Sequence, residues 1–307
     1  MLPQKKKTPR KKASKKNGSA FRSIVRLCSL LVLLLVLVFS VCTAGYVIFF
    51  RTVFAEEIPP SIKNGIVFEE PDPLVQVVPE EEKTVPKPEL PKVAIIIDDM
   101  GYHETIGRQL LALPFELTYS FLPFAPHTAT LEEEAYRSGK TIFLHLPLQP
   151  KGRQWHAGPG ALTLEDSPED QITKFEKCLH EVPHAVGVSN HMGSLYTEDP
   201  AAMTRLMQEI SRRRLSFVDS YTSAGSVGLR IAREHDVKSG GRHVFLDNIL
   251  TEENICWQLQ KLVTLAEKRG VGIGIAHPHQ ETLDAISSCA QDHKTRVHYV
   301  SVKEVLY

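Results

Sequence analysis

The chain has 307 residues, of which 42% are apolar and 23% are charged. Such a composition can build a sizeable core, which excludes a disordered or collagen-like protein. The formal charge is zero, with 36 basic and 36 acidic residues, but ten of the basic residues lie before residue 27, where no acidic residue occurs. The rest of the chain is therefore acidic, which argues against a nucleic-acid partner.

A long apolar run follows the basic segment 1–26. Residues 27–50 carry no charged side chain and are dominated by Leu, Val, Ile and Phe. As a helix they would reach about 36 Å, enough to cross a bilayer core. We predict one transmembrane signal-anchor helix over 27–50, with 1–26 in the cytoplasm by the positive-inside rule. The protein would then be a single-pass bacterial inner-membrane protein, with its remaining residues on the periplasmic side.

Two rival interpretations of this run are weaker. The small residues from Val41 to Gly45 suit signal-peptide cleavage, but the apolar run is longer than the usual core of roughly 7–15 residues. A core helix would show a polar solvent face, and the run has none. An uncleaved membrane anchor is the prediction that fits both observations.

Residues 51–91 are predicted to be an acidic, proline-rich linker. From Glu56 onward they hold nine acidic residues and seven prolines before Pro91. Such a segment buries too little apolar surface to fold, so we expect a disordered tether. The tether would hold a folded domain, predicted over 92–307, away from the membrane.

The five cysteines form no metal or redox motif. Cys28 and Cys42 fall in the apolar run, whereas Cys178, Cys256 and Cys289 are widely spaced in the domain. The last three allow one disulfide and leave one cysteine over, and no Cys-x-x-Cys pair indicates a thiolate zinc site. Cysteine chemistry is therefore not expected to be the function.

Short apolar runs alternate with amphipathic stretches through the domain. The runs are rich in β-branched residues and mostly apolar on both faces, as buried strands are. Helix start signals occur at Ser167, Asp199 and Thr251, and Gly270 suits a helix end. This β-α order implies an α/β fold, a distorted (β/α) barrel of seven or eight mainly parallel strands. The eight expected strands are 93–97, 117–121, 141–144, 185–188, 215–218, 244–246, 271–276 and 297–300.

Polar residues directly follow six of these runs. In parallel α/β proteins the functional site lies at the carboxyl ends of the strands, so Asp and His residues there suit metal binding and proton transfer. Each has a structural alternative: Asp247 could equally be a helix N-cap, and one histidine alone is more often a structural hydrogen-bonding group. The six ends are Asp98-Asp99, His145, Ser189-Asn190-His191, Asp219-Ser220, Asp247-Asn248 and His277.

Two features favour function over structure at these ends. Asp98 and Asp99 cannot both cap one helix, and three histidines at equivalent strand ends outweigh the structural interpretation of any single one. Around them run seven motifs, namely 95–101, 145–148, 158–162, 190–194, 217–220, 244–248 and 276–278. In order and spacing these motifs resemble the divergent polysaccharide deacetylase family across 95–305. The resemblance implies a distorted (β/α) barrel related to metal-dependent chitin and peptidoglycan deacetylases.

That resemblance also implies the roles of the site residues. In those deacetylases an Asp-Asp pair supplies a base and a metal ligand, and two histidines complete the metal site. They hold both histidines in one His-x-x-x-His motif, whereas His145 and His191 lie 46 residues apart here. The usual aromatic residue before the aspartates is Ile97, and the glycine follows one residue late, at Gly101.

We assign Asp99, His145 and His191 as ligands of a divalent metal, zinc being favoured. Asp98 would be the general base and His277 the general acid, while Asp219 would orient a histidine or bind sugar hydroxyls. Consecutive strand residues face opposite ways, so the roles of Asp98 and Asp99 are interchangeable at this point. The predicted substrate-binding residues are Asn190, Ser194 and Asp247.

Three functions fit these assignments. The first is a cell-envelope hydrolase that deacetylates N-acetylated amino-sugar polymers. The second is a catalytically degenerate module of the same fold that binds cell-wall glycan or an envelope protein, which the missing His-x-x-x-His motif favours. The third is another metal hydrolase, because fold does not fix the reaction. The expected partners are an envelope glycan and, through the N-terminal helix, the membrane.

Overall fold

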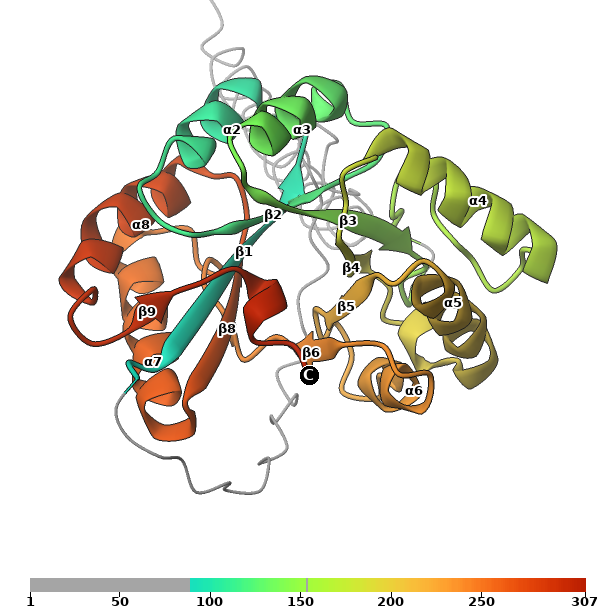
Figure 1. Ribbon diagram of the computed structural model, residues 1–307. Coiled ribbons are helices and arrows are strands. Elements are labelled where there is room, and N and C mark those ends of the chain that lie inside the picture. Colours follow the sequence, from blue (N-terminus) through green and yellow to red (C-terminus); the bar gives the residue numbers. More distant parts are fainter. Residues whose placement is uncertain (1–88, 153) are drawn as a thin grey trace, which may run out of the picture. The chain divides into compact units, whose positions relative to one another are not determined.

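The structure is a computed structural model that describes residues 89–152 and 154–307 (Figure 1). The predicted cytoplasmic segment 1–26, the transmembrane helix 27–50 and nearly all of the linker 51–91 lie outside the described residues. Among the residues that are described, no helix is both long and apolar enough to span a bilayer. The first strand begins at Lys92.

The centre of the domain is one sheet in which every strand pair is parallel. The strand order is β6-β5-β4-β3-β2-β1-β8-β7, and β9 pairs with the start of β1. The predicted parallel α/β architecture is therefore confirmed. The strands are β1 (Lys92–Met100), β2 (Thr118–Phe121), β3 (Thr141–Leu148), β4 (Gly187–Met192), β5 (Ser216–Asp219), β6 (Ser239–Gly241), β7 (Val244–Phe245), β8 (Val271–Ala276) and β9 (His298–Tyr299).

The sheet has nine strands in the described part of the chain, one more than the seven or eight predicted. The additional strand is β6, whose sequence is Ser239, Gly240 and Gly241. It has no β-branched or large apolar residue, so it lacks the composition that predicts a strand. The barrel interior leaves little room there, because a Cβ on Gly240 would approach Leu306 to 2.7 Å and Ile273 to 3.0 Å.

Helices connect the strands and cover the outer face of the sheet (Figure 1). Three of the predicted helix starts are confirmed by side-chain caps: Ser167 accepts from Asp170 N, Asp199 from Ala202 N, and Thr251 from Asn254 N. Gly270 follows the longest helix in a left-handed conformation, as the sequence predicts. The helices are α2 (Glu104–Leu111), α3 (Thr128–Arg137), α4 (Pro168–Glu181), α5 (Pro200–Arg212), α6 (Gly228–Glu234), α7 (Glu252–Arg269) and α8 (Gln280–Asp292).

The inner face of the sheet has a small core of its own. Along β1, Ile95 and Ile97 join the large core beneath the helices, whereas Ala94 and Ile96 face inward, as the alternation of strand side chains requires. The C-terminal segment, including the short helix η2 (Val302–Glu304), packs into this interior. The inner core comprises Ala94, Ile96, Phe143, Val218, Ile273, Ile275, Val300, Val302, Val305 and Leu306.

The sheet curls toward a barrel but leaves a seam. Its two end strands, β6 and β7, are separated in sequence only by Arg242 and His243 and do not pair with each other in the described structure. His243, directly before β7, extends the pairing of that strand with β8, since its N–H donates to Ile273 O at 2.8 Å and its Nδ1 accepts from Ile273 N at 2.9 Å. The fold is thus an open, parallel-stranded half-barrel.

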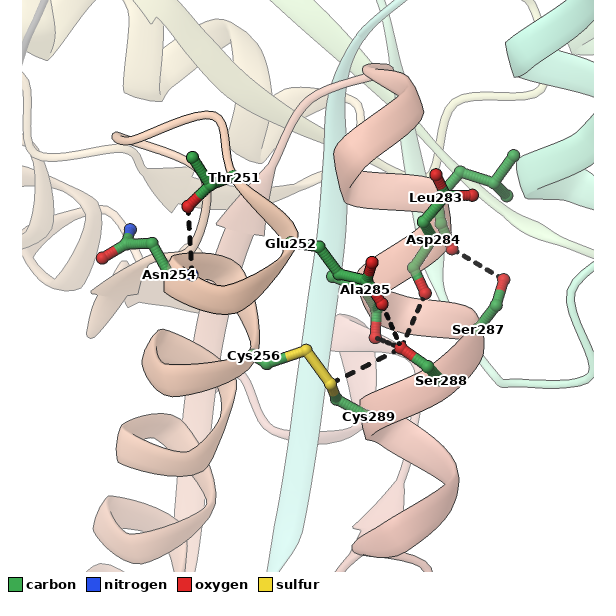
Figure 2. The surroundings of a disulfide bond; sticks show 10 residues. All are labelled: Thr251, Glu252, Asn254, Cys256, Leu283, Asp284, Ala285, Ser287, Ser288 and Cys289. Atoms are coloured by element: carbon green, nitrogen blue, oxygen red, sulfur yellow. Dashed lines mark hydrogen bonds between the residues drawn. A yellow bond between two sulfur atoms is a disulfide. The ribbon is translucent and has the colours of Figure 1, made fainter.

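A disulfide joins the two helices that pack beside β8. Cys256 on α7 and Cys289 on α8 are bonded, with a Cα–Cα distance of 5.7 Å (Figure 2). They lie 33 residues apart in sequence, and closing a loop of that length stabilises the fold by about 3–4 kcal/mol in the chain-entropy model. Cys178 is the free, buried cysteine of the described residues.

Candidate active site

The interior of the half-barrel changes from apolar to polar toward the carboxyl ends of the strands. Two residues beyond the inner-core positions 96, 143 and 275, the inward-facing side chains are Asp98, His145 and His277. These three groups meet at a cavity even though they come from β1, β3 and the end of β8. The cavity is lined by Asp98, His145, Asn190, His191, Met192, Ser220, Thr222, Phe245, Ile275 and His277.

An irregularity at the end of β1 turns both aspartates toward the same side. The register between β1 and β2 shifts between Ile97 and Met100, and Asp99 has a left-handed backbone with φ 55°. A bulge of this kind interrupts the alternation that would direct Asp99 outward. Asp98 Oδ1 lies 3.3 Å from His145 Nδ1, and Asp99 Oδ1 lies 3.1 Å from His145 Nε2. The two carboxylates therefore contact opposite nitrogens of one imidazole.

Asp99, His145 and His191 form a compact group of buried metal-type ligands. Their donor atoms all lie within 4.8 Å of one another, and Asp99 Oδ1 is 2.9 Å from His191 Nδ1. Asp99 is the aspartate that contacts both histidines, which separates its place from that of Asp98. Burial alone would raise the pKa of Asp99, but the two adjacent imidazoles hold it well below its usual range.

The carboxylate of Asp99 is the best test of whether a cation fits here. Both of its oxygens are buried and neither has a hydrogen-bond partner among the described residues, despite the short approaches of the two histidine nitrogens. The nitrogens are close, but neither contact meets the geometry of a hydrogen bond. A buried, unpaired carboxylate is costly. One oxygen and two nitrogens that converge without bonding to one another match a zinc donor set.

A second group of such ligands lies away from the cavity. Glu132 and Glu133 on α3 and His184 before β4 also approach one another. Here the buried carboxylate is already satisfied, because Glu132 accepts from the backbone N–H of His184 at 2.9 Å and contacts its ring at 3.0 Å. The ring of Tyr136 stacks on His184, with centroids 3.6 Å apart. This group therefore braces α3 against the chain that precedes β4.

His277 stands across the cavity with a carboxylate behind it. Its Nδ1 is 3.0 Å from Asp247 Oδ1, and Thr282 Oγ1 donates to Asp247 Oδ2 at 2.9 Å. Burial lowers the pKa of His277, but Asp247, together with Asp99 and Asp98, more than offsets this and raises it to about 9. Such a histidine is protonated at neutral pH and suited to donate a proton.

The position of Asp247 does not suit the predicted role in substrate binding. We expected it to bind substrate, but its side chain is fully buried and does not line the cavity. Both oxygens are occupied, one by the ring of His277 and the other by the backbone N–H of His277 and by Thr282. Asp247 therefore positions His277 and is itself unavailable to a ligand.

Asp219 also lies away from the cavity. On β5, Val218 belongs to the inner core and Ser220 lines the cavity, so the intervening Asp219 faces the helix layer. It accepts from Tyr221 N at 2.9 Å and from Ser226 Oγ at 2.6 Å. Burial raises its pKa. Asp219 therefore closes the β5–α6 loop. We expected it to orient a histidine or bind sugar, but strand parity directs it away from the cavity.

The two remaining predicted substrate-binding residues, Asn190 and Ser194, differ in their position relative to the cavity. Asn190 lines the cavity, and its amide braces two strand ends by accepting from Ser220 N at 2.9 Å and donating to Met192 O at 2.8 Å. Ser194 does not line the cavity, and its hydroxyl accepts from Lys151 N at 2.8 Å. Of the three predicted substrate-binding residues, Asn190 is the one that lines the cavity.

Two residues at the site have no counterpart in the predicted set. Ser220 lines the cavity, and its buried hydroxyl has no hydrogen-bond partner among the described residues. Arg242 follows β6 and donates to Ser220 O at 2.7 Å and to Tyr221 O at 3.1 Å. Burial lowers its pKa to about 10, so it remains charged. Arg242 was missed because it follows β6, a strand that the sequence did not predict. Ser220 stands at a predicted strand end, but the prediction chose its neighbour Asp219.

Backbone strain gathers on the same face of the sheet. Four residues other than glycine adopt left-handed conformations within three residues of the carboxyl ends of strands: Asp99, Phe124, Met192 and Tyr221, with φ between 49° and 60°. Such conformations are costly and are retained where the surrounding structure requires them, which is often at functional sites. Asp99 is a candidate ligand, and Met192 directly follows another.

Comparison with known proteins places the chain in a family. A family model described as "Divergent polysaccharide deacetylase" matches residues 95–306. The Escherichia coli (strain K12) "Uncharacterized protein YibQ" is 35% identical over 62% of this chain. The chain spans only 60% of the length of that relative. A Haemophilus influenzae relative, named only "Uncharacterized protein", is 34% identical over 64% of this chain and 70% of its own.

A solved structure has a similar fold. The crystal structure of the uncharacterized protein ATU2773 from Agrobacterium tumefaciens C58 superposes with a TM-score of 0.68 and 27% identity, covering 72% of this chain and 92% of that one. The sequence motifs, the half-barrel and the family match over residues 95–306 all agree. The chain belongs to the divergent polysaccharide deacetylase family.

Proposed function

We propose that the protein is a zinc-dependent hydrolase that removes acetyl groups from N-acetylated amino sugars of cell-envelope polymers. The observation that carries this proposal is the buried Asp99 carboxylate, which has no hydrogen-bond partner among the described residues and converges with His145 and His191. A base and an acid flank that group in one cavity, namely Asp98 and His277. Family membership supports carbohydrate deacetylation as the reaction class.

The residues of this chain divide the chemistry among them. Asp99, His145 and His191 would hold the zinc, which when bound supplies a Lewis acid for a carbonyl oxygen and for water. Asp98 would accept a proton from the attacking water, since its carboxylate lines the cavity. His277, held by Asp247 and protonated below about pH 9, would donate a proton to the departing amine.

The site leaves room for the substrate to be oriented by polar groups. Ser220 presents an unpaired hydroxyl to the cavity, and Phe245 adds an apolar wall beside His277, with ring centroids 5.1 Å apart. We assign Ser220 to a hydrogen bond with the amide or a hydroxyl of the bound sugar. A buried hydroxyl without a hydrogen-bond partner costs free energy, and a ligand that supplies the partner removes that cost.

An extracytoplasmic location is part of the proposal. The basic segment 1–26 and the apolar run 27–50 favour an inner-membrane anchor with the domain in the periplasm. The disulfide between Cys256 and Cys289 supports this location, because such bonds persist in oxidising compartments. There the domain would meet peptidoglycan and other envelope glycans.

Acetate release tests this function. The full-length protein, loaded with zinc, should release acetate from N-acetylated glycan fragments, and chelation should abolish the release. A panel of simple esters and peptidoglycan fragments, assayed in parallel, identifies the preferred class. Zinc binding without hydrolysis of any member would instead support a glycan-binding module, and hydrolysis of esters alone would indicate a different hydrolase.

A further inference from the structure

The hydroxyl of Ser189 contacts three other buried polar groups. Its Oγ is 2.7 Å from His145 Nδ1, 3.0 Å from Asp98 Oδ1 and 2.7 Å from Ser120 Oγ. None of the four side chains is appreciably exposed, since their residues are 0–2% accessible. The protein alone must therefore satisfy each donor and acceptor.

The sheet register explains why this hydroxyl is so well placed. Ser189 is the direct partner of His145 in the parallel ladder between β3 and β4. It also precedes His191 by two residues, so strand alternation puts both side chains on one face. β4 thus supplies one candidate metal ligand and, beside it, the group that contacts the other ligand.

For an ionised Asp98 and a neutral imidazole, counting protons at Ser189 allows one consistent arrangement. A serine hydroxyl offers one proton and two lone pairs. Ser189 donates its proton to Asp98 Oδ1, so its lone pairs accept from His145 Nδ1–H and from the hydroxyl of Ser120. The ring proton of His145 is then on Nδ1. Its Nε2, which lies 3.1 Å from Asp99 Oδ1, is left as a free lone pair.

The opposite tautomer fits the same contacts poorly. If His145 carried its proton on Nε2, Ser189 would have to donate to Nδ1 and could no longer donate to Asp98. Asp98 Oδ1 would then face a lone pair of Ser189 and, at 3.3 Å, the lone pair of Nδ1. On the other side, Asp99 Oδ1 makes no hydrogen bond with Nε2 that would repay this loss.

We infer that Ser189 is a positioning residue that fixes His145 in the Nδ1-protonated tautomer, presents Nε2 to a divalent cation, and ties this ligand to Asp98. The cation rests on the proposed function, whereas the tautomer is a property of the metal-free protein. Partners of this kind commonly set ring orientation and ligand basicity in metal sites. Here a hydroxyl on the neighbouring strand does so, which suits two histidines held on separate strands.

The tautomer can be measured directly in the metal-free, full-length protein. Nitrogen NMR of ¹⁵N-histidine-labelled protein, at alkaline pH where imidazoles are neutral, distinguishes the protonated from the unprotonated ring nitrogen. The His145→Ala variant identifies the resonances of His145. We expect Nδ1–H in the wild type, a shift toward Nε2–H in Ser189→Ala, and recovery in Ser189→Thr, which keeps the hydroxyl. Nε2–H in the wild type, or an unchanged tautomer in Ser189→Ala, would overturn the inference.

Zinc affinity provides the second measurement, by competition with a chromogenic chelator. Ser189→Ala should bind zinc about 10 to 100-fold more weakly, the range expected for a partner that orients a ligand, and Ser189→Thr should recover. Ser220→Ala is the matched control, because it deletes a hydroxyl at the end of the adjacent strand without touching His145, and its zinc affinity should not change.

A double variant separates an effect through His145 from general damage. In a His145→Ala background, whose weak residual zinc binding is measured at high zinc with a low-affinity chelator, Ser189→Ala should cause no further loss of zinc affinity, because the ligand that it positions is gone. An equal loss in both backgrounds would mean that Ser189 acts elsewhere and would overturn the inference. If the wild type itself bound no zinc, the proposed function would fail, and the tautomer measurement would still decide the role of Ser189.

Discussion

The two ends of the half-barrel interior are built from the same strands in opposite ways. At the amino end, side chains such as Ile96 and Ile273 pack against Val302, Val305 and Leu306 of the C-terminal segment. Two residues further along the strands, the inner face carries carboxylates and imidazoles that surround a cavity. One end, the closed end, is filled by side chains of the C-terminal segment, whereas the other, the open end, surrounds a cavity.

The features that destabilise the fold lie at the open end of the interior. The closed end is filled by apolar side chains that contact one another, which is the arrangement of an ordinary core. At the open end Asp99 adopts a left-handed backbone, and its two buried oxygens have no hydrogen-bond partner among the described residues. Both features destabilise the metal-free protein. Substitutions at the two ends should therefore separate ligand binding from stability.

Removing a candidate ligand should have the largest effect. His145→Ala and His191→Ala should each abolish stoichiometric zinc, because two remaining donors rarely hold zinc in competition with buffer. Metal analysis of the purified full-length proteins measures this directly. His184→Ala is the control, since it removes a histidine from the group around Glu132, which is satisfied internally. Full zinc content in the double variant of His145 and His191 would contradict this ligand set.

The two buried aspartates Asp98 and Asp219 sharpen the contrast between the inner and outer faces of the sheet. Asp98→Asn should retain zinc but lose about 10² to 10⁴-fold in turnover, the range of a general base. Asp219→Asn should keep turnover and lose stability instead, because Asp219 accepts from Tyr221 and Ser226 beneath α6. Acetate release and thermal unfolding, measured on the same samples, distinguish the two outcomes. Equal loss of turnover in both variants would return Asp219 to the site.

These contrasts also show which features of the site sequence patterns can predict and which they cannot. The strand-end rule correctly placed the candidate ligands and His277 close together, because the carboxyl ends of parallel strands meet whatever the details of packing. It could not choose between Asp219 and Ser220. That choice depends on Val218, whose side chain packs in the inner core, so that strand alternation directs Asp219 outward and Ser220 inward. It also could not foresee the bulge that turns Asp99 inward.

Other parts of the structure depended on contacts between distant segments. Strand β6 is too small and glycine-rich to be recognised, so the place of Arg242 beside the cavity was hidden. Asp247 was predicted to bind substrate, but its side chain is buried behind His277. Its task depends on a contact with His277, 30 residues later, which no local pattern encodes.

Shortening a side chain at the closed end should affect stability alone. Leu306→Ala removes a buried group that packs in the inner core, and we expect a loss of about 2 kcal/mol or more in the free energy of unfolding. Zinc affinity and turnover per bound zinc should not change, because the residue lies at the opposite end of the interior. Denaturant unfolding measures the first quantity, and chelator competition measures the second. A loss of zinc affinity at unchanged stability would show that the two ends are coupled.

The smallest expected effect is a shift in pH dependence caused by the carboxylate behind His277. His277 donates its proton in the proposed reaction, and its pKa is raised to about 9, chiefly by Asp247 against the opposing effect of burial. The acid form is present below that pH, so kcat/KM should fall as pH rises through it. Asp247→Asn removes the anion that stabilises the imidazolium, and the alkaline fall should therefore move to lower pH. Thr282→Val is the matched control, because it deletes a hydrogen bond to the same carboxylate and keeps its charge. If the fall occurs at the same pH in wild type and Asp247→Asn, then His277 is not the group that limits turnover at high pH.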